Sequence, residues 1–266
     1  MADGQPSKFV EIPPIVQELV TGVQEPPSRY IVPEQDRPDV AGSEMPEPIP
    51  IVDLSRLSSS DNSADENVKL SSALENWGLF LVVGHGMEPS FLGEVMEVTR
   101  EFYKLPLEEK QKYSNFVDGK EFRMEGYGSD MVISEKQILD WCDQFYLVVE
   151  PESRESILYG QHNLLLSDIL SEYTVRCREI TNLVLKNLTK LLSFDKDYLD
   201  ENGVNSIKLL LYRFNYYPHC PKPDQVFGLK PHSDATVITS LMITSVDSNC
   251  RKMATGTMCQ LLSFMH

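Results

Sequence analysis

His232 and Asp234 are the residues of this chain whose types and spacing best suit metal chemistry. Side chains two residues apart on an extended backbone point to the same side, because strand side chains alternate. An imidazole and a carboxylate placed in this way can bind one metal ion. Pro231 fixes its own φ angle and favours an extended residue before it, so we expect the ligand pair to be pre-shaped.

The alternative for this pair is a polar turn with a solvated carboxylate, and the other reactive side chains have similarly plain explanations. His219 and Cys220 could form a catalytic dyad, but they lie in a proline-rich connection that favours a turn over an activated thiol. His85 lies between two glycines and is expected to be a turn histidine. Nothing in the sequence fixes the position of His266, the final residue, as a further ligand.

Composition excludes several classes of function. With 266 residues, 41% of them apolar, the chain can bury the core of one large domain, or of one domain with a smaller N-terminal partner. Its 24 basic and 40 acidic residues give a formal net charge of -16, which argues against a nucleic-acid partner. No apolar run approaches the roughly twenty residues that cross a bilayer, so no membrane partner is expected. Five scattered cysteines without a C-x-x-C pair predict reduced thiols and a cytoplasmic protein.

The apolar pattern predicts helices followed by a strand-rich half. Residues 1–48, rich in proline, are expected to form an extended arm with one short helix near residues 15–20. The longest predicted helix covers about residues 167–192, where apolar positions keep a helical spacing. Further helices are predicted at about 65–77, from 89 to before Pro106, and at 108–112; strands at 49–54, 78–83, 143–149, 207–217 and 236–243; and a loop or hairpin at 119–138.

Several separated segments, among them Asn215 to Asp224 and the H-x-D pair after it, resemble the plant-type iron(II)- and 2-oxoglutarate-dependent dioxygenases, relatives of flavonoid, gibberellin and alkaloid oxygenases. The most specific segment runs from Asn215 through Tyr216, Tyr217 and Pro218 to Asp224, and leads into Gly228, Leu229 and the H-x-D pair. A single H-x-D pair is a weak signal, whereas this ordered set is not expected by chance. The resemblance covers about residues 10–245. Its other segments are Trp77 to Gly86, Phe102 to Lys110 and Leu139 to Phe145.

The resemblance implies a mixed α/β fold in which a double-stranded β-helix, or jelly roll, is backed by helices. It implies Fe(II) bound by His232, Asp234 and a further histidine, with 2-oxoglutarate as cosubstrate. Tyr217 and Asn215 match positions that help to hold 2-oxoglutarate in relatives, although Tyr217 also suits a plain strand aromatic. No catalytic residue is implied beyond the metal ligands.

The implied reaction is the hydroxylation, demethylation or desaturation of a small, largely apolar plant metabolite. Dioxygen is the further reactant, and ascorbate is a candidate reductant. Zinc-dependent hydrolysis on a related barrel is a weaker alternative, because the Asn-Tyr-Tyr-Pro run and the H-x-D pair point to iron only through the family.

The end of the sequence departs from the family's pattern. The family has a distal histidine and an R-x-S element whose arginine pairs with the distal carboxylate of 2-oxoglutarate, and neither is found after Asp234. We therefore expect an arm at residues 1–48, an N-terminal region at 49–165, a partial jelly-roll domain at 166–247 and a divergent tail at 248–266, with the C-terminal part of the jelly roll missing. The competing hypothesis is a catalytically silent truncated isoform that acts as a binding or regulatory protein, or is unstable.

Overall fold

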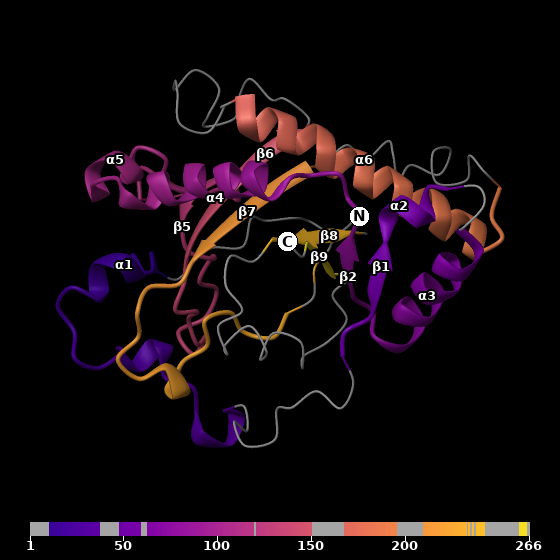
Figure 1. Ribbon diagram of the computed structural model, residues 1–266. Coiled ribbons are helices and arrows are strands. Elements are labelled where there is room, and N and C mark those ends of the chain that lie inside the picture. Colours follow the sequence, from indigo (N-terminus) through magenta and orange to yellow (C-terminus); the bar gives the residue numbers. More distant parts are fainter. Residues whose placement is uncertain are drawn as a thin grey trace, which may run out of the picture. The chain divides into compact units, whose positions relative to one another are not determined.

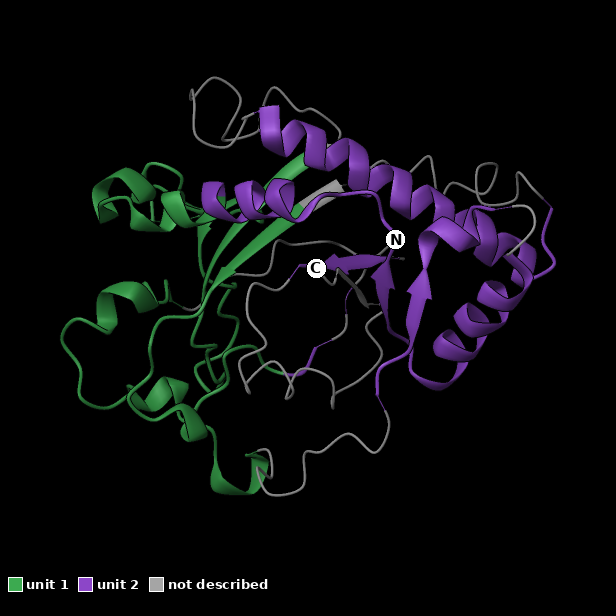
Figure 2. Cartoon of the chain, in the orientation of Figure 1, with its two compact units in different colours: residues 1–38, 99–162, 209–230 green, residues 39–98, 163–208, 231–266 purple. Residues whose placement is uncertain are grey.

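Helices and strands are mixed along the chain, as the sequence predicts (Figure 1). This computed structural model describes residues 11–37, 48–59, 63–119, 121–150, 168–195, 210–232, 234, 236, 238–242 and 261–264. The chain divides into two compact units, each assembled from three stretches of sequence (Figure 2). Unit 1 consists of residues 1–38, 99–162 and 209–230, and unit 2 of residues 39–98, 163–208 and 231–266.

Unit 1 contains a three-stranded antiparallel sheet in the order β5 (Gly126–Gly128), β6 (Asp143–Glu150), β7 (Leu210–Tyr216). Strand β6 confirms the predicted strand at 143–149, and β7 lies within the predicted strand at 207–217. The segment expected to be a loop or hairpin holds β5 and β4 (Glu121–Phe122), which pairs with β3 (Phe116–Val117).

Aromatic side chains pack onto this sheet from the end of α4 (Pro89–Lys104), whose residues from Thr99 onward belong to unit 1. Phe102 stacks on Phe145 of β6 with 4.3 Å between ring centroids, and Tyr103 stacks on Tyr216 of β7 at 4.8 Å. Helix α5 (Leu107–Gln111) begins shortly after α4 ends at Lys104. These stacked rings hold the strand that carries Asn215.

Residues 11–37 contribute side chains to a hydrophobic core cluster. They form α1 (Val16–Leu19) and the 3-10 turns η1 (Ser28–Tyr30) and η2 (Glu34–Asp36), joined by extended backbone. Val16 and Tyr30 are buried in one cluster with Val132, Leu139 and Trp141. The Tyr30 and Trp141 rings meet edge to face at 5.2 Å.

Unit 2 contains a parallel sheet in the order β1 (Ile51–Asp53), β2 (Phe80–Val83), β9 (Leu261–Phe264), β8 (Thr239–Leu241). The uniformly apolar sequence of 78–83 predicts a strand buried on both faces, which is wrong, because Phe80 and Val82 are buried while Leu81 and Val83 are partly exposed. Strand β9 was not predicted. Four residues are too few for a periodic signal, and its neighbours β2 and β8 come from distant parts of the sequence.

The helices of unit 2 are α2 (Leu54–Leu57), α3 (Ser63–Asn76) and α6 (Asp168–Leu191). Helix α6 confirms the long predicted helix, and its buried side chains keep the expected spacing. Helix α2 is a single turn that the apolar pattern did not indicate. It forms because the Asp53 carboxylate accepts hydrogen bonds from the backbone N–H groups of Ser55 and Arg56. Among the described helices, none has the length and apolar character needed to span a bilayer.

Candidate metal centre

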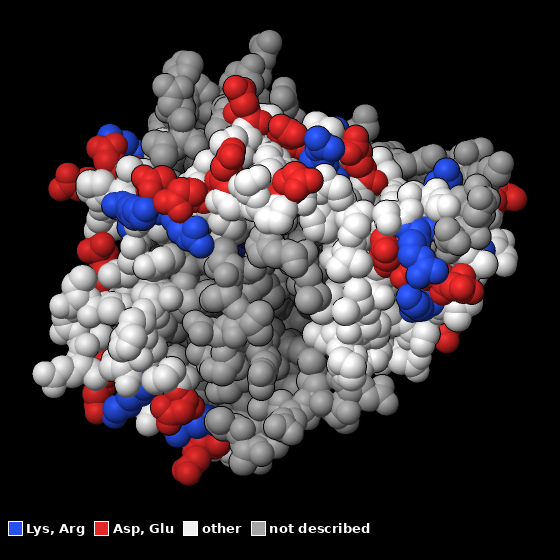
Figure 3. Space-filling view, viewed as in Figure 1, with Lys and Arg blue, Asp and Glu red and all other residues white. Residues whose placement is uncertain are grey.

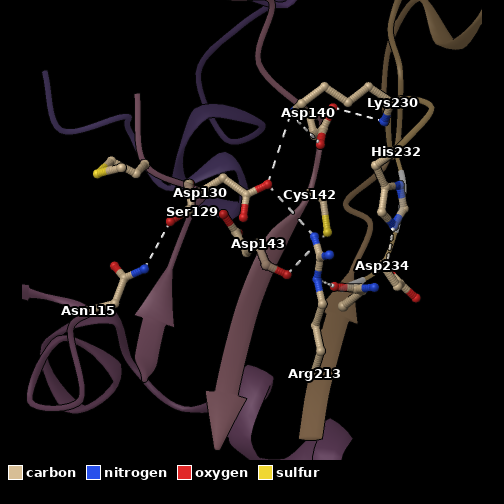
Figure 4. Close-up of polar contacts among 12 residues, drawn as sticks. Asn115, Ser129, Asp130, Asp140, Cys142, Asp143, Arg213, Lys230, His232 and Asp234 are labelled. Atoms are coloured by element: carbon tan, nitrogen blue, oxygen red, sulfur yellow. Dashed lines mark hydrogen bonds and ion pairs between the residues drawn. The ribbon is translucent and has the colours of Figure 1, made fainter. Parts of the chain in front are cut away.

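Strand β7 presents Arg213 and Asn215 on the same face of the sheet, because they are two residues apart. Arg213 Nε donates a hydrogen bond to Asn215 Oδ1 at 3.0 Å. The guanidinium lies over the Tyr146 ring, 5.2 Å from its centroid. Its Nη2 is 3.8 Å from an Asp130 carboxylate oxygen (Figure 4). The Asn215 amide is therefore held with its oxygen toward Arg213, which leaves the Nδ2 hydrogens for another acceptor.

Tyr217 follows directly after β7 and is 44% exposed. Its ring lies against the backbone of Gly228, where an added Cβ would approach Tyr217 Cδ1 to 3.2 Å. A side chain at position 228 would therefore crowd the ring. The glycine before the H-x-D pair thus serves a packing role at Tyr217.

The segment that leads to the H-x-D pair is tied down by Asp140 and Trp141. The Asp140 carboxylate accepts from the backbone N–H of Lys230 at 3.0 Å and from its Nζ at 2.9 Å (Figure 4). Burial raises the pKa of the Asp140 carboxyl, and the adjacent Lys230 ammonium opposes that rise. Trp141 donates its backbone N–H to Phe227 and its indole N–H to the Pro218 carbonyl. The chain is thereby fixed two residues before His232.

His232 and Asp234 face each other, with 3.3 Å between His232 Nε2 and Asp234 Oδ1 (Figure 4). Their side chains are 34% and 26% exposed, so solvent and small ligands can reach them. The other carboxylate oxygen, Oδ2, accepts a hydrogen bond from Thr239 at 2.7 Å. Both residues lie just before β8, where the sequence placed them.

The donor atoms of this pair fit one metal ion. Bonds of about 2.1 Å from a metal to two ligands at right angles place the donor atoms about 3 Å apart, close to the observed spacing. An imidazole nitrogen and a carboxylate oxygen with open neighbouring positions suit a non-haem Fe(II) centre. Within the described part of the chain, no group of three or more His, Cys, Asp and Glu side chains could hold a metal ion. His266 lies outside that part.

The remaining candidate side chains follow the plainer expectations. His85 Nδ1 accepts a hydrogen bond from the backbone N–H of Met87 at 3.1 Å, which confirms the turn histidine. Burial raises the pKa of the Cys220 thiol, the opposite of what an activated nucleophile requires.

Sequence reasoning missed four side chains that contact candidate residues or the segment before them: Arg213, Asp140, Lys230 and Thr239. Arg213 could have been found, because it shares a strand face with Asn215. Asp140 and Lys230 are 90 residues apart, and a threonine hydroxyl such as that of Thr239 has no sequence signature of its own.

Comparison with known families identifies two regions of the chain. Residues 49–165 match the model of the non-haem dioxygenase in morphine synthesis N-terminal region, and residues 209–258 match the 2OG-Fe(II) oxygenase superfamily. Protein SRG1 of Arabidopsis thaliana is 37% identical over 86% of this chain and 64% of its own length. Jasmonate-induced oxygenase 4 of the same plant is 32% identical over 91% of this chain and 67% of its own length.

Further similarities lie in one more relative and one solved structure. Oxoglutarate-dependent flavonoid 7-O-demethylase 1 of Ocimum basilicum is 34% identical over 86% of this chain and 60% of its own length. The crystal structure of JOX2 in complex with 2OG, Fe and JA matches with a TM-score of 0.70 and 29% identity, over 85% of this chain and 63% of that one. The chain thus spans less than two thirds of the length of several relatives, Protein SRG1 among them. The predicted jelly-roll class is confirmed, and the chain belongs to the 2OG-Fe(II) oxygenase superfamily.

Proposed function

We propose that this protein is an iron(II)- and 2-oxoglutarate-dependent oxidoreductase that hydroxylates, demethylates or desaturates a small plant metabolite. The observation that carries the proposal is the 3.3 Å spacing of His232 Nε2 and Asp234 Oδ1 on the H-x-D pair of a superfamily member. His232 and Asp234 are the residues that would hold the iron. Bound iron supplies the redox chemistry by which dioxygen converts 2-oxoglutarate to succinate and carbon dioxide, with the second oxygen atom going to the substrate in a hydroxylation.

The chain's own side chains would orient the oxo acid. Asn215 and Tyr217 are the proposed contacts, and the Arg213 hydrogen bond fixes the Asn215 amide so that its Nδ2 can donate to an oxo-acid oxygen. Tyr217 is 44% exposed, so a ligand can reach part of the residue. Ascorbate is proposed as the reductant that keeps iron in the Fe(II) state.

The proposed substrate is a small molecule, and the proposed location of the reaction is the cytoplasm. The flavonoid demethylase and the JOX2 complex, by their names, act on or bind small organic molecules. The described cysteines, Cys142, Cys177 and Cys220, carry free thiols, which supports a reducing compartment. Among the described residues seen in Figure 3, basic side chains are interspersed with acidic ones and do not gather into a patch that would suit nucleic acid.

Anaerobic titration of the protein with Fe(II) and 2-oxoglutarate tests the proposal. A chelated oxo acid gives a visible metal-to-ligand charge-transfer band, which we expect in the natural chain and not in His232→Ala or Asp234→Ala. His219→Ala is the matched control, because His219 is an exposed histidine outside the proposed site. No band in the natural chain at saturating iron would contradict the proposal.

Turnover is tested separately by iron-dependent formation of succinate from 2-oxoglutarate in air. A chelate band without succinate formation would favour the silent binding protein over the enzyme. Succinate formation that depends on His232 and Asp234 would exclude that alternative.

A further inference from the structure

Both oxygens of the Asp234 carboxylate are engaged, and by different partners. Oδ1 lies 3.3 Å from His232 Nε2, on the side where a shared metal ion would bind. Oδ2 accepts a hydrogen bond from Thr239 Oγ1 at 2.7 Å. Thr239 Oγ1 is in turn 2.7 Å from Thr236 Oγ1. All four residues belong to unit 2.

The number of protons fixes the direction of these hydrogen bonds. Each hydroxyl has one proton to donate, and an ionised carboxylate has none. Thr239 must therefore donate to Asp234, so the proton between the two threonines comes from Thr236. The result is a chain of two hydroxyls that ends on a charged acceptor. Such bonds are stronger than neutral ones, and successive bonds polarise each other.

The donor is better fixed than the carboxylate that it contacts. Thr239 is the first residue of β8, where it pairs in register with Leu261 of β9. Branching at Cβ restricts the Thr χ1 angle, so the hydroxyl has few directions available. Asp234 lies outside the described strands, on the segment before β8. Strand β8, through Thr239, therefore fixes the orientation of the Asp234 carboxylate, rather than the carboxylate fixing Thr239.

We propose that Thr239, supported by Thr236, is a positioning residue that makes Asp234 bind the metal through Oδ1 alone. This inference rests on the proposed function. A carboxylate that binds through both oxygens takes one coordination position more than a carboxylate that binds through one. When a further histidine of the family's pattern completes the site, the two donor oxygens of 2-oxoglutarate and dioxygen together need all three remaining positions of an octahedral site. The hydroxyl on Oδ2 keeps the position beside Asp234 open.

The decisive variants differ in one group each. Thr239→Val keeps the branched shape and removes the hydroxyl, whereas Thr239→Ser keeps the hydroxyl. Thr236→Val removes only the outer link at an exposed position, where a folding defect is not expected. Ser240→Ala is the matched control, because Ser240 is the next residue of β8 and points to the other face.

The measurement is the dissociation constant for Fe(II) under anaerobic conditions. Loss of a partner that orients a metal ligand costs about 10- to 100-fold in metal affinity, and we expect a loss in this range for Thr239→Val. We expect Thr239→Ser and Ser240→Ala to stay within about threefold of the natural chain, and Thr236→Val to lose about three- to tenfold, with unchanged thermal melting.

A second readout needs no metal. The ¹³C chemical shift of the Asp234 carboxyl in the metal-free protein reports the hydrogen bond at Oδ2, and we expect it to move in Thr239→Val and not in Thr239→Ser. Equal iron affinities and equal carboxyl shifts in Thr239→Val and the natural chain would overturn the positioning role alone. If the natural chain takes up no iron, the proposed function fails and the positioning role fails with it.

Discussion

Asp143 is the buried carboxylate on which the N-terminal segment depends. It is fully buried and accepts hydrogen bonds at 2.7 Å from the backbone N–H groups of Val16 and Gln17, at the start of α1. Burial raises the pKa of this carboxyl to about 6, and the two N–H bonds and nearby Lys110 only partly oppose the rise. The folded protein therefore binds this proton more tightly than the unfolded chain does.

The first prediction is a pH dependence that originates at Asp143. The stability that the Asp143 carboxyl contributes is complete below its ordinary pKa of 3.8 and is lost as pH rises through its folded-state pKa of about 6. The loss in unfolding free energy is up to about 3 kcal/mol. Asp143→Asn should remove this slope between pH 4 and 7, whatever its effect on absolute stability. The measurement is the free energy of unfolding in denaturant at several pH values. Identical slopes in both proteins would show that the carboxyl is not titrating there.

The second prediction concerns the ion pair of Asp140 and Lys230. Asp140→Ala removes the acceptor of two hydrogen bonds and leaves the Lys230 backbone N–H without its carboxylate, so we expect a loss of about 1–3 kcal/mol of unfolding free energy. Lys230→Met should cost less, because its backbone bond to Asp140 remains. Glu172→Ala breaks an exposed pair with Arg176 and serves as the control, at about 0.5 kcal/mol or less. A loss as small as the control's would mean that Asp140 does not fix this segment.

The sequence indicates the proposed ligand pair but not the side chains that hold the pair or the segment before it. His232 and Asp234 can be recognised in the sequence because side chains of residues i and i+2 on an extended backbone point to the same side. Thr239 acts through a hydrogen bond, and Asp140 through a partner 90 residues away, so neither is marked by a local pattern.

At the scale of elements, the turn after β2 depends on a glycine. Gly84 has a φ of +63°, and a Cβ there would lie 2.3 Å from Asp53 Oδ1, the oxygen that caps α2. Gly86 has a similar φ of +76° but no atom within 4 Å of an added Cβ. A side chain at Gly86 would therefore introduce backbone strain alone, whereas a side chain at Gly84 would introduce backbone strain and a steric clash.

The third prediction uses this pair. Gly86→Ala should cost about 1–2 kcal/mol of unfolding free energy, since an L residue is strained in the left-handed region. Gly84→Ala should cost at least about 1 kcal/mol more, because it also displaces the Asp53 cap. Thermal and denaturant unfolding of both variants measure the difference. Equal losses would mean that Asp53 moves aside without cost.

Length decides which elements the sequence reveals. The stripes of α4 and α6 and the eight residues of β6 repeat often enough to be recognised. Helix α2 and strand β9 have four residues each, and their existence depends on a cap and on sheet neighbours. Local pattern therefore predicts the long elements, whereas tertiary context determines the short ones.

At the scale of the whole molecule, neither compact unit is a continuous piece of chain. Strand β6 pairs along its length with β7, which comes from a stretch beyond residue 208. Composition and resemblance predict the fold class, but no sequence pattern predicts this interleaving. It follows from pairings between residues sixty or more positions apart.

The fourth prediction is that a fragment of residues 49–165 does not fold alone. It contains β6 without β7, and β2 without β9, so two strands would have unpaired edges. We expect a non-cooperative melt by circular dichroism, against a cooperative melt for the full chain. Cooperative unfolding of the fragment would show that its own contacts suffice.

The hydrogen bonds from α1 to Asp143 also set an order of events during synthesis. The acceptor is translated 127 residues after Val16, and the Trp141 ring that covers Tyr30 emerges with it. At typical elongation rates this is a delay of about 6 to 25 s. Throughout that time Val16 and Tyr30 lack these core partners, so chaperones have an interval in which to bind this segment before it is buried.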